Sequence, residues 1–320
     1  MKKMFRFVLA LSLCISLFAC SNTSNVVAVT VYPIQYLVER IGGDVVTVYC
    51  ISEDEAIQTA SLNEDAESIL EKSQVLFYIQ ELEPYFDIYY DMFVDSGVDL
   101  VDLESKSVFY EFQRYTTTTV NGSTTAVTSA YYDGDAFDYV DLYQHDPIIW
   151  MDPISMLSCA EIIRDYLIEA YPSYESTFVE NYESLEYDLT KLDCEYQELK
   201  DYDNIAFVCM TPSFGIWQQS YGIEIYPVCL SSYGALPSDE QLEIIKQAIL
   251  DAGVEYIAYE PNLNEEMQAL YDELKEELNL KEVTISNISS LSEEQAQQNK
   301  DYLTIMYENL ESLMQIGANE

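Results

Sequence analysis

Hydrophobic residues along the first part of the chain fall into short β-branched runs that alternate with longer runs of helical spacing. In chain order, strand, helix, strand, helix and strand are predicted at 26–31, 34–41, 45–50, 64–72 and 75–79. The first helix stops at Gly42-Gly43, as helices commonly do, and Ser61 with Glu64 fits a capping box for the second. This alternation predicts a parallel sheet covered by helices.

The middle of the chain carries one long run of helical periodicity. Its apolar side chains follow one another at spacings of 4, 3, 4, 3, 4 and 3, at Phe178, Tyr182, Leu185, Leu189, Leu192, Tyr196 and Leu199. A helix over 172–200 is therefore predicted, with a length of roughly 40 Å at 1.5 Å per residue. A coiled coil has the same pattern, but a single segment between two α/β halves is more typical of a connecting strut.

The strand–helix alternation returns after the long helix. The predicted strands are 205–209, 223–229, 256–259 and 282–285, and the main helices are 238–252, 265–278 and 292–316. Capping boxes are predicted at Ser238 with Gln241 and at Ser292 with Gln295. The fold class is therefore α/β with two lobes, each a parallel sheet flanked by helices, joined by one long helix.

These elements define a domain organisation and a place for a ligand. The N-terminal lobe is expected at 26–171, the connecting helix at 172–200 and the C-terminal lobe at 201–320. Within the first lobe, 110–144 is rich in Thr, Tyr and Asp and poor in aliphatic residues, which predicts a long exposed loop or hairpin. Ligands of open α/β sheets bind beyond the carboxyl ends of the strands, so a cleft between the lobes is expected. A rigid strut allows only limited closure of such a cleft.

The N-terminus has the pattern of a bacterial lipoprotein signal. Lys2, Lys3 and Arg6 precede an apolar run over 7–19, which is too short to span a bilayer and ends at Cys20. We expect a signal peptide at 1–19, a polar tether at 20–25 and a lipid anchor on Cys20. The protein would then be secreted and anchored at the bacterial cell surface or on the periplasmic face. The alternative is an ordinary secretory signal with an incidental cysteine.

The charge balance excludes some classes of partner. The chain has 14 basic and 57 acidic residues, and loss of 1–19 leaves 11 basic residues against 57 acidic ones, a net charge of −46. Nucleic acid and anionic membrane surfaces would repel such a protein. An enzyme is not expected, because the chain has one histidine and no GxSxG, HExxH or phosphate-loop motif. A monomer is expected.

Several segments, in order along the chain, resemble one family. Residues 146–153, Asp-Pro-Ile-Ile-Trp-Met-Asp-Pro, resemble its DPHxWLDP signature, and Phe214-Gly215 followed by Tyr221-Gly222 resembles its HxxFG…YG segment. Further similarity lies at 29–33, 41–44, Leu82-Glu83-Pro84-Tyr85, Tyr259-Glu260-Pro261-Asn262 and Asp301-Tyr302-Leu303. The family is that of the zinc/manganese ABC-transporter solute-binding lipoproteins, some of which are also called adhesins. The similarity extends over 26–313.

The resemblance implies a metal cargo, Zn or Mn, and an ABC permease as partner. The family holds its ion between the lobes with three histidines and one carboxylate, donors that suit Zn²⁺ and Mn²⁺. In this sequence the four positions align to Ala56, Ile148, Thr211 and Ser286. Alanine and isoleucine have no donor atom, and threonine and serine offer only neutral oxygens. The resemblance therefore predicts a solute-binding protein whose metal site is altered or lost.

Other residues are candidates for a replacement ligand set. They are the acidic run Glu53, Asp54 and Glu55 for a hard cation, His145 near the signature, and Cys209 and Cys229 near strand ends. The two cysteines are also candidates for a thiolate site or a disulfide. The alternatives are a solvated acidic surface, an exposed histidine without a ligand role, and buried apolar cysteines.

Aromatic residues suggest a different kind of ligand. Tyr32, Trp150, Thr211 and Tyr259 are expected to line the cleft, with Ile148 and Tyr233 close by. Such a cleft suits a small organic ligand, although core or interlobe packing explains the aromatic residues equally well. Two functions follow: the solute-binding component of an importer, or a surface lipoprotein that uses the fold for adhesion or for binding an organic ligand without metal.

Overall fold

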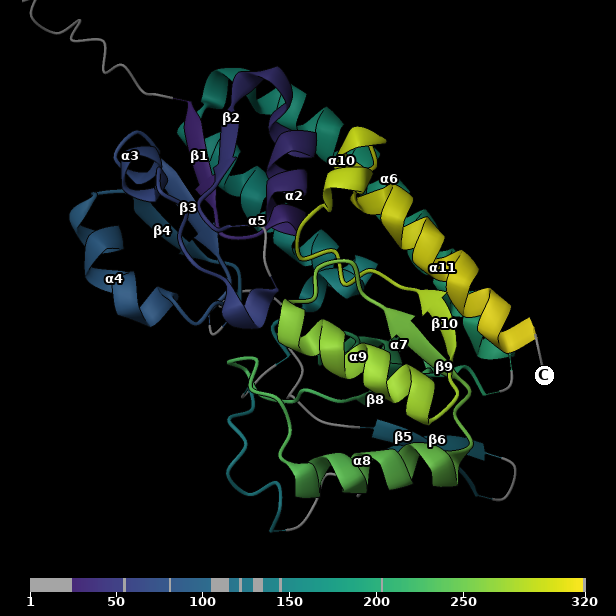
Figure 1. Ribbon diagram of the computed structural model, residues 1–320. Helices are drawn as coiled ribbons and strands as arrows, with labels where there is room; N and C mark the ends of the chain where they lie inside the picture. The colour runs from purple at the N-terminus through teal and green to yellow at the C-terminus, as the bar shows by residue number, and fades with distance from the viewer. Residues whose placement is uncertain are drawn as a thin grey trace, which may run out of the picture.

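The first lobe is built on a four-stranded parallel sheet. In the computed structural model, which describes residues 25–53, 56–80, 82–104, 115–120, 123–128, 135–143, 146–202 and 204–318, its order is β2-β1-β3-β4 (Figure 1). The strands are β1 (Val26–Val29), β2 (Thr47–Cys50), β3 (Val75–Tyr78) and β4 (Asp99–Asp102). All three pairings are parallel, so the carboxyl ends of the four strands share one edge.

Alternate residues of this sheet enter two hydrophobic layers, as the pleat requires. Val27, Val29 and Phe77 pack toward α2 (Tyr32–Gly42) and α5 (Pro153–Ala170). Ala28 and Leu76 pack toward α3 (Ala66–Leu70) and α4 (Phe86–Asp95) on the other face. Short 3-10 turns follow some of these elements, at η1 (Gly43–Val45), η2 (Ile57–Thr59) and η4 (Ile149–Met151).

The second lobe repeats the plan. Its parallel sheet has the order β10-β9-β7-β8. The strands are β7 (Ala206–Cys209), β8 (Glu224–Pro227), β9 (Tyr256–Tyr259) and β10 (Lys281–Thr284). One face packs against α7 (Gly215–Tyr221) and α11 (Tyr302–Ala318), and the other against α8 (Asp239–Ala252) and α9 (Glu265–Glu277). The α/β fold with two parallel sheets, predicted from the sequence, is confirmed.

A continuous helical segment joins the lobes, as predicted. It consists of η5 (Pro172–Tyr174), α6 (Glu175–Gln197) and η6 (Glu198–Asp201). The seven apolar positions of the periodic run are all buried. α6 packs against α2 and α5 of the first lobe and against α11 of the second (Figure 1). One hydrophobic core therefore extends through both lobes along this helix.

The structure differs from the predicted elements at several points. α4 and β4 were not predicted, and the helix expected over 292–316 is divided into α10 (Glu293–Gln297) and α11. Asn299, between them, has a φ of 53°, a left-handed conformation that asparagine tolerates and that ends a helix. The capping boxes at Ser238 and Ser292 are confirmed. The one at Ser61 is wrong, because its hydroxyl donates instead to Glu53 and α3 begins later, at Ala66.

The segment 110–144, where described, contacts the second lobe. β5 (Tyr115–Val120) and β6 (Ser123–Thr128) form an antiparallel hairpin that lies against β8 and α7 (Figure 1). Phe137 is only 8% exposed and packs with the core beneath α8, and the Gln241 side chain donates to the carbonyl of Ala136. The expected hairpin is present. Near it, Phe137 is buried against the second lobe, whereas the neighbouring Tyr139 is 94% exposed, so this part of the segment is exposed as predicted but anchored to the second lobe and not to the first.

No helix in the described ranges is both long enough and apolar enough to cross a bilayer.

Candidate functional site

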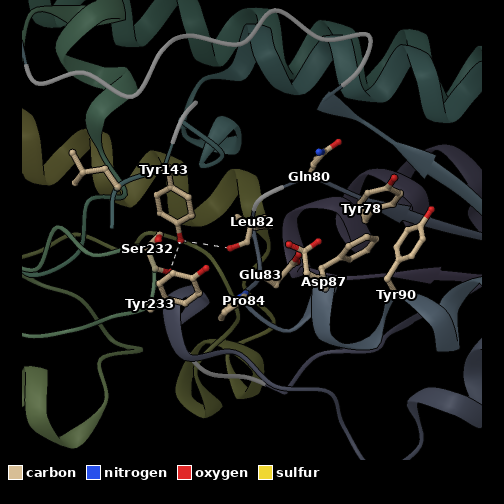
Figure 2. Close-up of a pocket in the computed structure, with 12 residues that line it drawn as sticks. Tyr78, Gln80, Leu82, Glu83, Pro84, Asp87, Tyr90, Tyr143, Ser232 and Tyr233 are labelled. Atoms are coloured by element: carbon tan, nitrogen blue, oxygen red, sulfur yellow. Dashed lines mark hydrogen bonds between the residues drawn. The ribbon is translucent and has the colours of Figure 1, made fainter. Parts of the chain in front are cut away.

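Segments that follow the strands of the two lobes meet at the interlobe boundary. The Tyr143 hydroxyl lies 3.5 Å from the carbonyl oxygen of Leu82, after β3, and 3.4 Å from that of Ser232, after β8 (Figure 2). Gly234 has a φ of +70°, and a Cβ there would lie 3.2 Å from the Cβ of Gln58. This close approach and backbone conformation both favour glycine. The carboxyl-end loops of both sheets therefore form one candidate site, as expected for this fold.

Thr211, which the sequence resemblance aligns with the third metal-ligand position, takes part in a buried hydrogen-bond network. Glu260, which directly follows β9 and is 1% exposed, accepts from the backbone N–H groups of Met210 at 2.8 Å and Thr211 at 3.1 Å. It also accepts from the Thr211 hydroxyl and from Asn287 Nδ2 at 3.2 Å. Burial raises the pKa of Glu260 to about 7, although these donors favour the ionised form. The Thr211 side chain is thus held by protein donors and acceptors.

Ser286, which the resemblance aligns with the fourth metal-ligand position, is also fixed by several hydrogen bonds. Its backbone N–H donates to Asn309 Oδ1 and its carbonyl accepts from Asn309 Nδ2, both at 2.8 Å. Its hydroxyl accepts from the N–H of Ile288, which has a φ of 58°. That conformation is rare and strained for a β-branched residue. The loop after β10 is therefore stabilised by its own side chains and Asn309.

The first two positions are apolar and buried. Ala56 is 2% exposed at the start of η2, and Ile148 is 1% exposed. The Ile148 N–H donates to Asp146 Oδ1 at 3.1 Å, which fixes the turn that carries the signature. The described residues contain no group of three or more His, Cys, Asp or Glu placed to hold a metal ion.

The structure separates the candidate replacement ligands. Glu53 is exposed and accepts from Ser61 at 3.0 Å, and its neighbours Asp54 and Glu55 lie outside the described residues, as do His145 and Cys20. Cys209 and Cys229 belong to different hydrophobic clusters and no disulfide joins them, so the disulfide hypothesis is wrong. Burial, with Glu260 nearby, raises the pKa of the Cys229 thiol to about 12, which disfavours a thiolate ligand.

Most of the aromatic residues expected along the cleft are packed within the lobes. Trp150 is fully buried and its indole N–H donates to the Asn287 carbonyl across the lobes at 2.6 Å, so it serves interlobe packing. Tyr259 stacks edge-on against Tyr271 under α9. Tyr32 packs against the shared core. Tyr233, by contrast, lines a recess of about 500 Å³ between the lobes.

The same recess contains a carboxyl group that the sequence interpretation did not select. Glu83 lines it, is 4% exposed, and neither of its carboxyl oxygens has a hydrogen-bond partner within the described part of the chain. Burial raises the pKa of Glu83 to about 8. The signal available in the sequence was the position of Glu83 just after β3, within one of the segments that carry the family resemblance. A second, more open groove of about 840 Å³ passes Ala56 and the loops after β9 and β10.

The sequence model of one family matches nearly the whole chain. It is described as "ZnuA: Zinc-uptake complex component A periplasmic", and the match covers residues 27–316. The zinc-binding lipoprotein AdcA of Streptococcus pneumoniae is 28% identical over 179 residues, which is 56% of this chain and 35% of that protein. The zinc-uptake protein ZnuA of Bacillus subtilis is 23% identical over 169 residues, which is 52% of each chain. The matches to AdcA span about a third of that protein's length.

Solved structures share the fold. The zinc-bound ZnuA-like domain of S. pneumoniae AdcA has a TM-score of 0.68 at 21% identity, covering 91% of this chain and 98% of that one. A mutant of the laminin-binding adhesin Lmb of Streptococcus agalactiae has a TM-score of 0.71 at 18% identity, with the same coverage. At these identities the similarity establishes the architecture and says nothing of what occupies the cleft.

Proposed function

This chain belongs to the ZnuA family of zinc-uptake complex components, and from that premise we propose that it is a solute-binding component whose cleft does not hold a transition metal in the family's manner. The family consists of solute-binding proteins of ABC importers and not of enzymes. Membership in an uptake complex implies a membrane permease as the partner. A lipid on Cys20 would keep the protein at the membrane surface beside that permease.

One observation supports the proposal: the four positions that the sequence resemblance aligns with the family's metal ligands offer no free donor atom. Ala56 and Ile148 are aliphatic, and the oxygens of Thr211 and Ser286 already bond to Glu260 and to Ile288. A four-coordinate zinc site needs nitrogen, sulfur or carboxylate donors on one centre. The Glu260 carboxylate, which contacts Thr211, already accepts from four protein donors.

The proposal is tested by zinc and manganese titration of the purified protein. Competition with a chromophoric chelator, with the thiols kept reduced, is expected to show no stoichiometric site of sub-micromolar dissociation constant. Only weak binding that salt suppresses is expected, because the many carboxylates form a diffuse negative surface. The zinc-bound ZnuA-like domain of AdcA is the positive control.

A single tight zinc site would overturn the proposal. The double variant Cys209→Ser/Cys229→Ser would then show whether thiols hold the ion, and His145→Ala would test the histidine. Retention of tight binding in both variants would direct attention to the acidic run at 53–55.

A further inference from the structure

The recess between the lobes has the composition of a small-molecule site. It lies between the turn after β3 with the start of α4 on one side and the loop after β8 on the other (Figure 2). The rings of Tyr78, Phe86, Tyr143 and Tyr233 form much of its wall, and Glu83 and Asp87 supply carboxylates. Its volume of about 500 Å³ is within the range of sites that enclose small organic ligands.

Glu83 is the unusual member of this wall. Its two oxygens are buried without a hydrogen-bond partner, whereas nearly all buried polar groups in proteins have one. The buried Thr30 hydroxyl also lacks a partner of hydrogen-bond geometry among the described residues, but it lies near enough to Glu83 to favour the ionised carboxylate. Two phenol hydroxyls that interact electrostatically with Glu83 form their hydrogen bonds elsewhere: Tyr85 with Ser52 at 2.5 Å, and Tyr143 with the carbonyls of Leu82 and Ser232. Thr30 and the Glu83 backbone N–H favour the ionised carboxylate only in part, and both carboxyl oxygens keep acceptor capacity that no described donor fills with hydrogen-bond geometry.

The charges around Glu83 indicate whether the recess favours an anionic, a neutral or a cationic ligand. The other titratable groups among the described residues of the recess are acidic or phenolic: Tyr78, Asp87, Tyr90, Tyr143 and Tyr233. Tyr85 and Tyr143 interact electrostatically with Glu83, and Cys50 and Asp146 interact with those two tyrosines. No lysine, arginine or histidine is among the described residues that line the recess. An anion would be repelled by the ionised acidic groups, and a neutral molecule would supply no charge to favour ionisation of Glu83. An ammonium group supplies both the N–H donors and the charge that Glu83 lacks.

We propose that this recess binds an organic ammonium ion, with its N–H groups donated to the Glu83 carboxylate and its hydrocarbon part packed against the tyrosine rings. The ring faces add cation–π attraction. A bare metal ion fits less well, because the buried Glu83 and the exposed Asp87, set among aromatic rings, provide fewer oxygen ligands than hard cations require. The inference rests on the proposed function, since it names the class of solute that the altered cleft takes.

Binding is expected to be linked to a proton. With a pKa of about 8, Glu83 holds a proton at neutral pH before the ligand enters, and the ammonium ion favours the ionised carboxylate. The proton leaves to solvent as the ion pair forms. The apparent affinity is therefore expected to rise about tenfold for each pH unit between pH 6 and 8.

The test is calorimetric titration with n-butylamine and 1,4-diaminobutane, with n-butanol as the neutral probe of matched length. At pH 7, the amines are expected to bind at one site at least tenfold more tightly than n-butanol. Titrations in two buffers of different ionisation enthalpy are expected to show release of close to one proton. Glu83→Gln is expected to weaken amine binding at least tenfold and to abolish the proton release, whereas Glu67→Gln, an exposed glutamate on α3, leaves both unchanged.

Equal affinity for the amines and n-butanol would overturn the inference, as would unchanged amine binding in Glu83→Gln. The proton release of the unsubstituted protein is independent of whether the variant folds, and its absence at pH 7 would also count against Glu83. The zinc titration separates the two proposals. Tight zinc binding contradicts the proposed function, whereas absence of both zinc and amine binding contradicts only the ammonium site.

Discussion

Replacing Glu83 with glutamine is expected to flatten the pH dependence of stability between pH 4.5 and pH 8. In the folded protein Glu83 keeps its proton up to about pH 8, and in the unfolded chain it loses it near its ordinary pKa of 4.5. Between these values the unfolded state binds fewer protons, so the free energy of unfolding falls as pH rises. The contribution is absent below pH 4.5 and complete above pH 8.

The expected magnitude is large for one side chain. Since one pKa unit corresponds to about 1.4 kcal/mol, the unpaired carboxyl group costs roughly 5 kcal/mol by pH 8. The free energy of unfolding of both proteins, measured in urea at pH 5, 6.5 and 8, gives this contribution. Glutamine has nearly the same shape and does not ionise, so the variant and the unsubstituted protein should differ little at pH 5 and most at pH 8.

Other ionisable groups determine the pH dependence of stability that remains in Glu83→Gln, and an exposed glutamate provides a control variant. Burial raises the pKa of Glu260 to about 7, so ionisation of this group also lowers the free energy of unfolding as pH rises. This contribution is the same in Glu83→Gln and in the unsubstituted protein. Glu67→Gln, at an exposed position, is expected to reproduce the unsubstituted curve. Parallel stability curves for Glu83→Gln and the unsubstituted protein would show that Glu83 finds a partner that keeps it ionised at neutral pH.

Glu260→Ala is expected to destabilise the second lobe by about 3–5 kcal/mol. The substitution leaves the N–H groups of Met210 and Thr211, the Thr211 hydroxyl and the Asn287 amide without their acceptor in a buried place. Each unsatisfied donor carries a desolvation penalty, and they all arise together. The free energy of unfolding in urea at pH 7 is the measurement.

Two variants make this result specific. Glu260→Gln keeps one oxygen acceptor and the side-chain volume, so it is expected to cost less than alanine. Glu276→Ala, on the exposed side of α9, is expected to change stability by less than about 0.5 kcal/mol. A small effect of Glu260→Ala would mean that water replaces the carboxylate, and the loop at Thr211 would then be less rigid than its hydrogen bonds indicate.

Much of the architecture was predictable because it depends on local patterns. The spacing of apolar side chains predicted the long helix, and the capping boxes at Ser238 and Ser292 depend only on residues three positions apart. Ser61 was misleading because Glu53, eight positions earlier, competes for its hydroxyl. The association of Phe137 with the second lobe had no local signal, since the second-lobe residues of its hydrophobic cluster lie about 70 or more positions further along the chain.

Two glutamates show a property that the sequence does not reveal and that the tertiary structure determines, namely which buried carboxyl group has hydrogen-bond donors. Glu83-Pro84 and Glu260-Pro261 each follow a buried strand and look equivalent in the chain. The sequence by itself determined that a site with three histidines is impossible, because composition alone limits the donors. Only the fold supplied Glu260 with donors, from Met210 and Thr211 about 50 positions away and from Asn287. It left Glu83 facing a recess, because hydrogen-bond satisfaction depends on which distant groups the packed lobes bring together.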